Sequence, residues 1–257
     1  MTSNYDKELG LAEKLADCAR ASVLSYFRKP LEIDTKKDES PVTIADRETE
    51  KAMRALIEDT FPDHGILGEE FGAVRTDAEY VWTLDPIDGT KSFITGSPLF
   101  GTLIALLKEG KPVIGIIDMP ALTERWIGCT GHPTTFNGQN VRVRPCANIN
   151  DAWLYATSPH MFKEGDFQAF EEVRKQSHCT LYGTDCYAYG LLANGACDLV
   201  IEATMGVYDF CALVPVVTGA GGTMTDWLGR PLGLASDGRV IAAGDKAIAE
   251  AAMALLA

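Results

Sequence analysis

The sequence predicts an α/β protein that combines helices with an antiparallel sheet in its first half and alternates strands with helices in its second half. Three features support this prediction. Two amphipathic helical patterns open the chain, and short β-type runs separated by Gly- and Asn-containing turns follow, up to about Val143. After about Asn148, strand-like and helix-like segments alternate. We therefore expect antiparallel and mixed sheets that alternate with helices.

The two opening helices follow from the spacing of their apolar residues. The first covers residues 4 to 27, where apolar side chains recur at three- and four-residue steps, and Pro30 ends it. The second runs from about Ile44 to Thr60 and ends at Phe61-Pro62. Its inner face is expected to consist of Ala45, Ala52, Met53 and Leu56.

The middle of the chain reads as an antiparallel meander. Its apolar runs are short, rich in β-branched and aromatic residues, and bounded by turn residues. The expected strands are YVWTL (80–84), FGTLIALL (100–107), KPVIGIIDM (111–119), TERWIGC (123–129) and VRVRP (141–145).

The second half predicts four strands and four helices in alternation. Pro215 falls inside one of these helices and predicts a kink, because proline removes a backbone N–H donor. The expected strands are AWLYATS (152–158), TLYG (180–183), DLVIEA (198–203) and RVIAAG (239–244), and the expected helices are DFQAFEEVRKQSH (166–178), CYAYGLLANG (186–195), YDFCALVPVVTGAG (208–221) and KAIAEAAMALLA (246–257).

The two halves are expected to form one unit. No linker rich in Pro, Gly or Ser separates them, and the chain shows no internal repeat or low-complexity tract. A chain of 257 residues can also bury a substantial core. We treat residues 1–147 and 148–257 as subdomains of a single unit over residues 1–257.

Charge and cysteine content narrow the possible partners. The formal net charge is −13, so electrostatic attraction to nucleic acid or an anionic membrane is not expected. The first ten residues are polar and acidic, and no apolar run approaches the roughly 20 residues of a membrane span. We expect a soluble cytoplasmic protein with reduced thiols, because there is no C-x-x-C pair among Cys18, Cys129, Cys146, Cys179, Cys186, Cys197 and Cys211.

The stretch LDPIDGT, residues 84–90, carries the clearest chemical signal. Asp85 and Asp88 flank Pro86, which should make the chain turn at the end of a strand. Two carboxylates so close repel each other unless a hard cation such as Mg²⁺ lies between them. The backbone amides of Gly89 and Thr90 are suited to an anion. An ordinary surface turn remains the alternative, since Asp, Pro and Gly are common turn residues.

Four further acids matter only in combination. Glu69 and Glu70 follow an apolar run that ends in Gly, and a solvated loop would explain them equally well. Asp46 and Asp209 are each expected near a helix start, where capping or first-turn acids are ordinary. Alone, none of these residues identifies a site.

Taken together, these stretches resemble a known family. SPVTIADRETE (40–50), GEE (68–70), LDPIDGT (84–90) and YDFCALVPVVTGAGG (208–222) resemble the motifs of the inositol monophosphatase superfamily, which are Mg²⁺-dependent phosphomonoesterases. The resemblance covers essentially the whole chain, and the separation of Asp46 from Glu69 also suits the family. It implies a layered αβαβα fold, similar to inositol monophosphatase and fructose-1,6-bisphosphatase.

The resemblance also implies roles for individual residues. The backbone carbonyl of Ile87 would join the side-chain ligands of two or three Mg²⁺ ions. Asp46 and Thr90 would orient and help deprotonate the attacking water, and Glu69 would take part in catalysis with them. Glu70 would be a neighbour of the metal ligands without binding the metal itself. Phosphate would bind at Gly89, Thr90 and Lys91, although a lysine on a solvent-facing helix surface is an equal explanation. The implied side-chain ligands are Glu69, Asp85, Asp88 and Asp209.

Substrate recognition is expected from the second half, which looks most like the histidinol-phosphate phosphatase branch. Asp185 stands where inositol monophosphatases usually have a small neutral residue, so it suggests a cationic group on the substrate. Its alternative role is a helix N-cap. Glu202 matches the acid that contacts the substrate, and it could accept a hydrogen bond from an amine or from an inositol hydroxyl.

The expected function is Mg²⁺-dependent hydrolysis of L-histidinol phosphate to L-histidinol and phosphate, in histidine biosynthesis. Inositol monophosphatase activity is the first alternative. A non-catalytic regulator that binds a phosphorylated ligand or a protein is the second. The partner would be a small phosphate ester, and family relatives suggest a homodimer. The four histidines show no ligand spacing and are expected to be structural or exposed.

Overall fold

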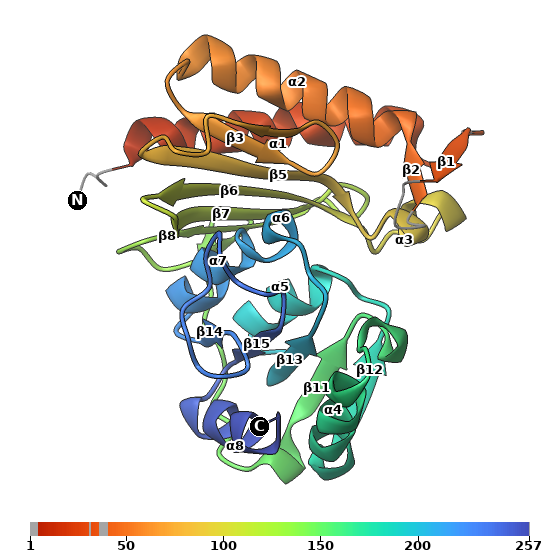
Figure 1. Ribbon diagram of the computed structural model, residues 1–257, viewed down its shortest axis with the longest axis vertical. Coiled ribbons are helices and arrows are strands. Elements are labelled where there is room, and N and C mark those ends of the chain that lie inside the picture. Colours follow the sequence, from red (N-terminus) through yellow and green to blue (C-terminus); the bar gives the residue numbers. More distant parts are fainter. Residues whose placement is uncertain (1–4, 31, 36–40, 257) are drawn as a thin grey trace.

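The computed structural model consists of alternating layers (Figure 1). Helices α1 and α2 cover one face of an eight-stranded sheet, and α5, α6 and α7 separate that sheet from a five-stranded one. Helices α4 and α8 cover the far face of the second sheet. This arrangement is the predicted layered αβαβα fold. The structure describes residues 5–30, 32–35 and 41–256, so residues 4, 40 and 257, which belong to predicted segments, lie outside it.

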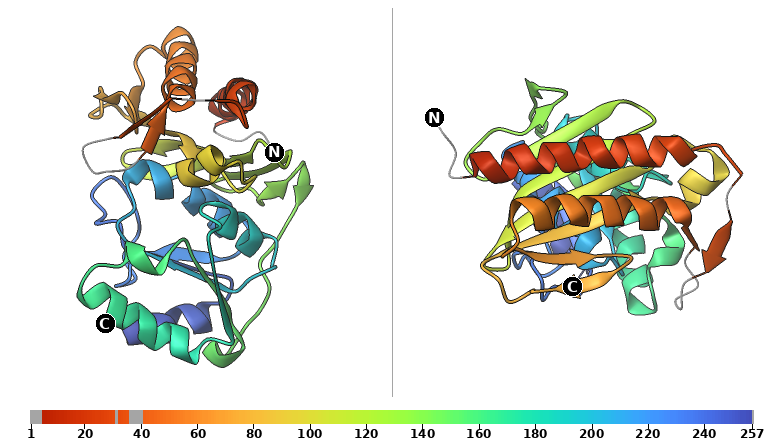
Figure 2. Two further views of the ribbon diagram at one scale, coloured as in Figure 1. Left: turned by 90° about the vertical axis from the view of Figure 1, so that its right-hand side faces the viewer. Right: turned by 90° about the horizontal axis from the view of Figure 1, so that it is seen from above.

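Helices α1 (Asp6–Tyr26) and α2 (Ile44–Thr60) confirm the two predicted opening helices. They lie side by side across the sheet (Figure 2). The predicted inner face of α2 is only partly right, because Ile57 is buried and Leu56 is not. This face is also more polar than the apolar pattern predicts, since its fully buried residues include Asp46, Thr49 and Glu50.

The first sheet contains the predicted antiparallel meander. Its strands run in the order β10-β9-β8-β7-β6-β5-β3-β4, with β5 to β8 antiparallel and β3 parallel to β5. A separate two-stranded ribbon, β1 (Ile33–Thr35) with β2 (Pro41–Thr43), precedes α2. The sheet consists of β3 (Gly65–Gly68), β4 (Gly72–Val74), β5 (Tyr80–Asp88), β6 (Gly101–Lys108), β7 (Lys111–Met119), β8 (Glu124–Cys129), β9 (Thr135–Phe136) and β10 (Gln139–Asn140), and the short helix α3 (Thr90–Thr95) follows β5.

The predicted strand over residues 141–145 is wrong. This segment connects the two sheets, and its backbone groups bond to different parts of the protein instead of to one strand. The Val141 N–H donates to the Thr134 carbonyl, and the Val143 N–H donates to the Ala220 carbonyl. The alternation of polar and apolar residues in this segment therefore does not mark a strand. It marks a connecting segment that buries one of its sides.

The second half matches the predicted alternation, with one strand added. Its sheet is mixed, in the order β12-β11-β13-β15-β14, and sequence analysis missed only β14. Its elements are β11 (Trp153–Ala156), α4 (Gly165–Gln176), β12 (Cys179–Tyr182), α5 (Tyr187–Ala193), β13 (Leu199–Glu202), β14 (Thr223–Thr225), β15 (Val240–Ala243) and α8 (Lys246–Leu256).

The predicted helix over residues 208–221 is two helices, α6 (Val207–Phe210) and α7 (Leu213–Gly219). The expected kink is therefore a break before Pro215. Pro215 lies in the first turn of α7, where a missing N–H costs little. The break lets α6 aim its side chains at the first sheet while α7 packs along β7 and β8.

Each space between layers holds its own apolar cluster. One cluster joins α1 and α2 to the first sheet, a second fills the space around α5 and α7, and a third joins α4 and α8 to the second sheet. Burial of this apolar surface is the main stabilising contribution to the fold. None of the helices in the described ranges is both long enough and apolar enough to cross a membrane.

Candidate active site

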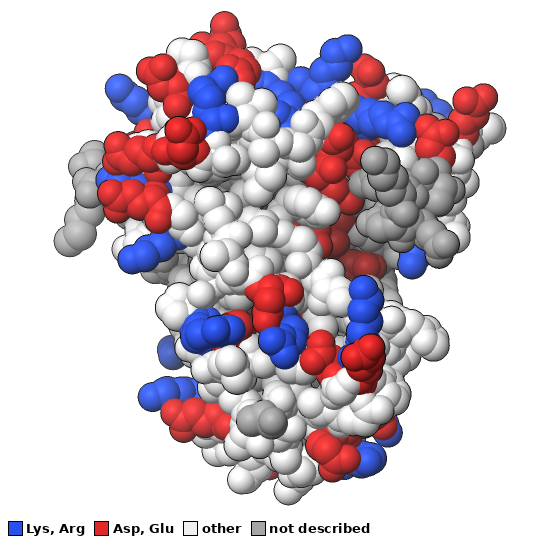
Figure 3. Space-filling model, in the orientation of Figure 1, with Lys and Arg blue, Asp and Glu red and all other residues white. Residues whose placement is uncertain are grey.

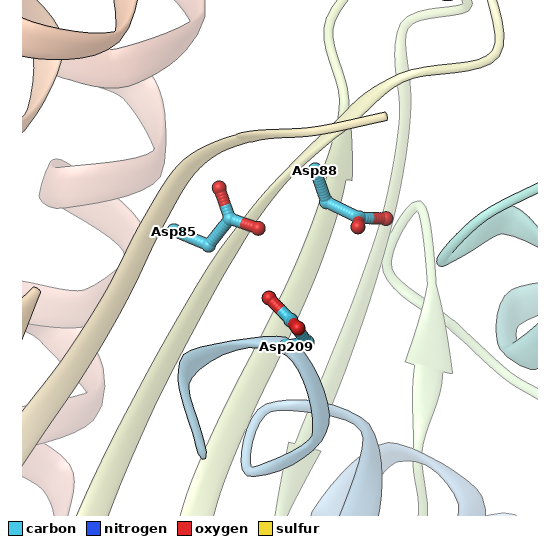
Figure 4. A group of neighbouring side chains, drawn as sticks. All are labelled: Asp85, Asp88 and Asp209. Carbon is cyan, nitrogen blue, oxygen red and sulfur yellow. The ribbon is translucent and has the colours of Figure 1, made fainter. Parts of the chain in front are cut away.

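Three aspartates far apart in sequence meet where the two halves join. Asp85 and Asp88 lie at the end of β5, and Asp209 lies in α6 (Figure 4). Each offers a carboxylate oxygen, and these oxygens all lie within 4.8 Å of one another. Acidic side chains also gather on the surface where the upper and lower layers meet (Figure 3).

The end of β5 explains how two neighbouring aspartates reach one site. We expected the chain to turn after Leu84, but β5 continues to Asp88 and the register with β6 shifts between Asp85 and Asp88. Pro86 lies in this irregular stretch, where its missing N–H cannot pair with β6. Its carbonyl accepts a hydrogen bond from the Thr102 hydroxyl at 2.8 Å. The Ile87 N–H donates to Asp85 Oδ1 at 2.9 Å, which orients that carboxylate.

Asp209 is held by its own helix start. Its Oδ2 accepts a hydrogen bond from the Gly206 N–H at 2.7 Å, which is the half of a capping box that the N3 side chain makes. The ordinary interpretation of Asp209 as a first-turn acid is therefore correct. The same geometry brings its carboxylate to the two aspartates of β5.

The electrostatics of this cluster favour a bound cation. Burial, followed by the charges of Glu69 and Asp88, raises the pKa of Asp85 well above its ordinary value. Burial and Asp88 likewise raise the pKa of Asp209, and burial raises that of Asp88 to about 6. A divalent ion with a preference for oxygen ligands removes this penalty, because it lets all these carboxylates ionise together. The donor set therefore fits Mg²⁺.

Glu69 borders the same site from the turn after β3. Its N–H donates to the Leu84 carbonyl at 3.1 Å, directly before Asp85. Its charge contributes to the raised pKa values of Asp85, Asp88 and Asp209. The main chain of Glu70 is held from the other side, since its N–H donates to Glu50 Oε2 at 2.7 Å.

A cavity of about 300 Å³ opens over the acidic cluster. It gathers nine of the residues predicted for the site, and adds Pro41 and Thr157, which sequence analysis missed. None of the four histidines, all of which the structure describes, lines it. The predicted residues in its lining are Glu69, Asp85, Ile87, Asp88, Gly89, Thr90, Lys91, Asp185 and Asp209.

Asp46 lies outside the described lining, at the start of α2. Its Oδ2 accepts hydrogen bonds from the Thr43 N–H at 2.8 Å and the Thr43 hydroxyl at 2.7 Å. Burial raises the pKa of Asp46, and the Thr43 hydrogen bonds partly offset this. The hydroxyl of Thr90 donates to the Ile87 carbonyl at 3.0 Å. Within the described part of the chain, no hydrogen bond joins Asp46 to Thr90.

Asp185 forms one wall of the cavity beside Gly89. Gly89 has φ 80°, and a Cβ there would lie 3.2 Å from Asp185 Oδ2, so a larger residue would crowd the carboxylate. The N-cap alternative for Asp185 is wrong, because Cys186 precedes α5 and no side chain caps that helix. Burial and the charge of Asp88 raise the pKa of Asp185 to about 7, whereas Lys91 opposes the shift.

Glu202 is buried and does not belong to the described lining of the cavity. Its Oε1 accepts from the Thr157 N–H at 2.8 Å, and its Oε2 accepts from the Tyr189 hydroxyl at 2.9 Å. Burial raises its pKa to about 7. Sequence analysis missed Thr157 and Tyr189. The position of Thr157 just after the parallel strand β11 was the available signal, because ligands gather at the carboxyl ends of such strands.

Comparisons with known proteins agree on the family. A model described as the inositol monophosphatase family matches residues 4–257. The chain is 50% identical over 260 residues to a protein of Arabidopsis thaliana named bifunctional phosphatase IMPL2, chloroplastic, covering 98% of this chain and 75% of that protein. It is 35% identical over 237 residues to a histidinol-phosphatase of Chlorobaculum parvum, covering 91% and 92% of the two chains.

A solved structure shows the same fold. An inositol monophosphatase from Zymomonas mobilis has a TM-score of 0.92 and 49% sequence identity, over 99% of both chains. The layered architecture is therefore shared over the whole length of both proteins.

Proposed function

This chain belongs to the inositol monophosphatase family, and we propose that, as a phosphatase of that family, it hydrolyses L-histidinol phosphate to L-histidinol and phosphate in histidine biosynthesis. The position of Asp185 carries this proposal. Its carboxylate borders the cavity next to the acidic cluster, and its pKa is raised to about 7. An ammonium group on the substrate keeps such a carboxylate ionised, whereas the hydroxyls of inositol supply no positive charge.

We propose Mg²⁺ as the cofactor, with two or three ions per site. The ligands would be the carboxylates of Glu69, Asp85, Asp88 and Asp209 and the carbonyl of Ile87. When bound, Mg²⁺ lowers the pKa of the attacking water and stabilises the leaving alkoxide. The carboxylates of the chain would hold the positive charge of Mg²⁺ where the ester and the water meet.

The remaining residues would bind the phosphate and handle the proton. The N–H groups of Gly89 and Thr90 and the ammonium of Lys91 would bind the phosphate oxygens. The carboxylate of Asp46 would accept the proton of the attacking water together with Thr90. The raised pKa of Asp46 suits this role, because a base with a pKa nearer to the working pH transfers protons more effectively.

The proposal is tested by assaying several phosphate esters with Mg²⁺. We expect kcat/KM for histidinol phosphate to exceed that for inositol phosphate and for an aryl phosphate whose alcohol part carries no positive charge. Asp185→Asn should lower kcat/KM for histidinol phosphate by about 10- to 100-fold, because a charge-assisted hydrogen bond contributes roughly 1.5–3 kcal/mol. It should leave the aryl phosphate nearly unaffected. Asp63→Asn, which changes an exposed acid by the same charge, is the control.

Inositol monophosphatase activity is the second candidate. The Arabidopsis and Zymomonas relatives favour keeping it, since one is named a bifunctional phosphatase and the other an inositol monophosphatase. A preference for inositol phosphate, together with full activity of Asp185→Asn, would replace our first choice.

We further propose that residues 1–257 act as one catalytic unit with subdomains 1–147 and 148–257. We propose a homodimer by analogy with relatives. A cytoplasmic location agrees with the free state of all seven cysteines. Light scattering of the purified protein tests the dimer.

A further inference from the structure

Glu50 is a fully buried acid on α2 that the catalytic proposal does not use. Both oxygens of its carboxylate nonetheless accept hydrogen bonds. Oε2 accepts the Glu70 N–H at 2.7 Å, and Oε1 accepts the Phe71 N–H at 3.1 Å and Arg54 Nε at 2.7 Å. Two of these three donors are backbone groups of the turn between β3 and β4. Glu50 therefore connects α2 to the residues that directly follow Glu69.

Arg54 extends this contact to the far end of the same turn. Its Nη2 donates to the Gly72 carbonyl, while its Nε pairs with Glu50. The N–H of Glu69 itself donates to the Leu84 carbonyl of β5. The turn is thus bonded to β5 at its beginning and to α2 along the rest of its length. We call Glu50 and Arg54 together the α2 clamp.

Close packing leaves the Glu50 carboxylate little freedom. A Cβ placed on Gly68 would overlap it. The carboxylate therefore lies against the main chain immediately before Glu69 as well as immediately after it. A buried charge with three donors and no room to move holds its partners in one arrangement, because any displacement leaves a buried polar group without a partner.

We propose that Glu50 is a positioning residue for the metal centre, holding the β3–β4 turn so that Glu69 faces Asp85. This inference rests on the proposed role of Glu69 as a metal ligand. Glu50 does not touch the metal in this proposal and acts only through the main chain of the turn. The competing interpretation is a purely structural ion pair with Arg54, whose loss would reduce stability and leave metal affinity unchanged.

The first test is direct Mn²⁺ binding to Glu50→Gln, measured by calorimetry and by electron paramagnetic resonance, with Mn²⁺ replacing Mg²⁺. Glutamine keeps the shape but offers one acceptor oxygen for two backbone N–H groups. We expect the dissociation constant to rise about 10-fold or more, as for other residues that orient metal ligands. Glu58→Gln is the matched control, because Glu58 lies on the same helix and pairs with Arg75 on the half-exposed surface. It should bind Mn²⁺ like the wild type.

Two further variants separate positioning from simple charge. Arg54→Gln removes a positive charge, so a purely electrostatic effect would tighten Mn²⁺ binding, whereas loss of the clamp would weaken it. Gly68→Ala changes no charge and displaces the Glu50 carboxylate, so it should also weaken binding. Both variants also keep the test available if Glu50→Gln does not fold.

Glu69→Gln distinguishes this inference from the proposed function. Weaker Mn²⁺ binding in Glu69→Gln, with wild-type binding in folded Glu50→Gln and Gly68→Ala, overturns the inference and leaves the metal site intact. Wild-type binding in Glu69→Gln overturns the metal site itself. Tighter binding in Arg54→Gln shows that charge rather than position is what Glu50 and Arg54 contribute.

Discussion

Asp88, a proposed metal ligand, lies where its charge is unfavourable for the metal-free folded protein. It lies among other carboxylates, and burial raises its pKa to about 6. Its Oδ2 accepts a hydrogen bond from the Cys186 N–H at 2.7 Å. Without a cation, its negative charge is unfavourable in the folded protein, whereas its oxygen is still useful as an acceptor. The charge and the hydrogen bond can therefore be separated by substitution.

We expect Asp88→Asn to reduce kcat/KM by at least about 100-fold, because a metal ligand should matter at least as much as a residue that orients one. The metal-free variant should unfold at the same temperature as the wild type or higher, since Asn can still accept from Cys186 without the charge repulsion. Phosphate release and thermal unfolding in EDTA are the measurements.

Asp59→Asn serves as the control for this prediction, because Asp59 is exposed on α2. Unchanged hydrolysis in Asp88→Asn would contradict the metal mechanism. A wild-type protein that binds the esters and hydrolyses none of them would instead support the regulator alternative.

The raised pKa values also predict how stability depends on pH. The pKa of Asp88 is raised from 3.8 to about 6, that of Asp185 from 3.8 to about 7, and that of Glu202 from 4.5 to about 7. The folded state therefore binds more protons than the unfolded state between these values, so stability falls as pH rises through that window. In EDTA, the unfolding temperature should decrease from about pH 5 to about pH 8.

Mg²⁺ should reverse this trend, because it binds the ionised carboxylates and competes with protons. Its stabilising effect should accordingly be larger at about pH 8 than at about pH 5. Thermal scans with EDTA or excess Mg²⁺ measure both effects. A metal-free unfolding temperature that increases across this range would contradict the assigned shifts.

Motif residues and supporting residues differ in how far sequence can identify them. The acids of the cluster stand in recognisable patterns, and the structure brings Asp85, Asp88 and Asp209 together. Tyr189 carries no such signal, and Glu50 ends the motif SPVTIADRETE without any pattern that reveals its role, because the importance of both residues depends on hydrogen bonds to partners that only the folded chain brings near. An apolar-periodicity argument even places acids of α2 in solvent, since it has no means to recognise a satisfied buried carboxylate.

At the level of elements, periodicity predicts long segments well and connections poorly. Helix α2 begins and ends where the sequence predicts, because a full amphipathic pattern and a capping Thr43 agree. The false strand over 141–145 and the break between α6 and α7 depend on neighbouring elements. The break in particular accompanies a close contact of α7 with β7 and β8, which no local pattern encodes.

Gly115 of β7 lies against the start of α7, and a Cβ there would overlap the carbonyl of its N-cap residue Ala212. Gly115→Ala should therefore destabilise the protein by about 1–3 kcal/mol through overpacking. It should also weaken Mg²⁺ activation, because the break between α6 and α7 would move together with Asp209. Urea unfolding and the Mg²⁺ concentration for half-maximal activity test these two effects.

Gly10→Ala is the matched control, and its expected effect on stability is opposite to that of Gly115→Ala. Gly10 lies inside α1 and a Cβ there would meet nothing within 4 Å. Alanine should stabilise the helix by about 0.5–1 kcal/mol. Equal effects of the two substitutions would show that contact with Ala212 is not what restricts residue 115.

For the whole molecule, the site depends on both halves being in place. Two aspartates come from the first sheet and one comes from a helix of the second half. A cation shared among them would connect layers that otherwise adhere through the apolar cluster around α5 and α7. The presence of helices and of antiparallel and mixed sheets could be predicted from the pattern of elements, whereas the order of the layers and this meeting point required family motifs or a structure.

Mg²⁺ at about 100 times its dissociation constant should stabilise the protein by about 2.7 kcal/mol. Asp209→Asn should reduce this stabilisation by at least about 1.4 kcal/mol, equivalent to a tenfold loss of affinity. Asn can still accept from the Gly206 N–H, so the metal-free stability should change little. Urea unfolding with and without Mg²⁺ provides the comparison, and equal stabilisation of both proteins would contradict the bridging role of Asp209.

The hydrogen bond from Cys186 to Asp88 also matters for redesign of the enzyme. One short segment carries both the Asp185 side chain, which is proposed to select the alcohol, and the Cys186 amide, which donates to the proposed metal ligand Asp88. Grafting a foreign loop to accept a new alcohol would therefore put turnover at risk along with selectivity. Exchanging only the side chain at Asp185 while preserving the backbone path offers engineers a way to alter one property without sacrificing the other.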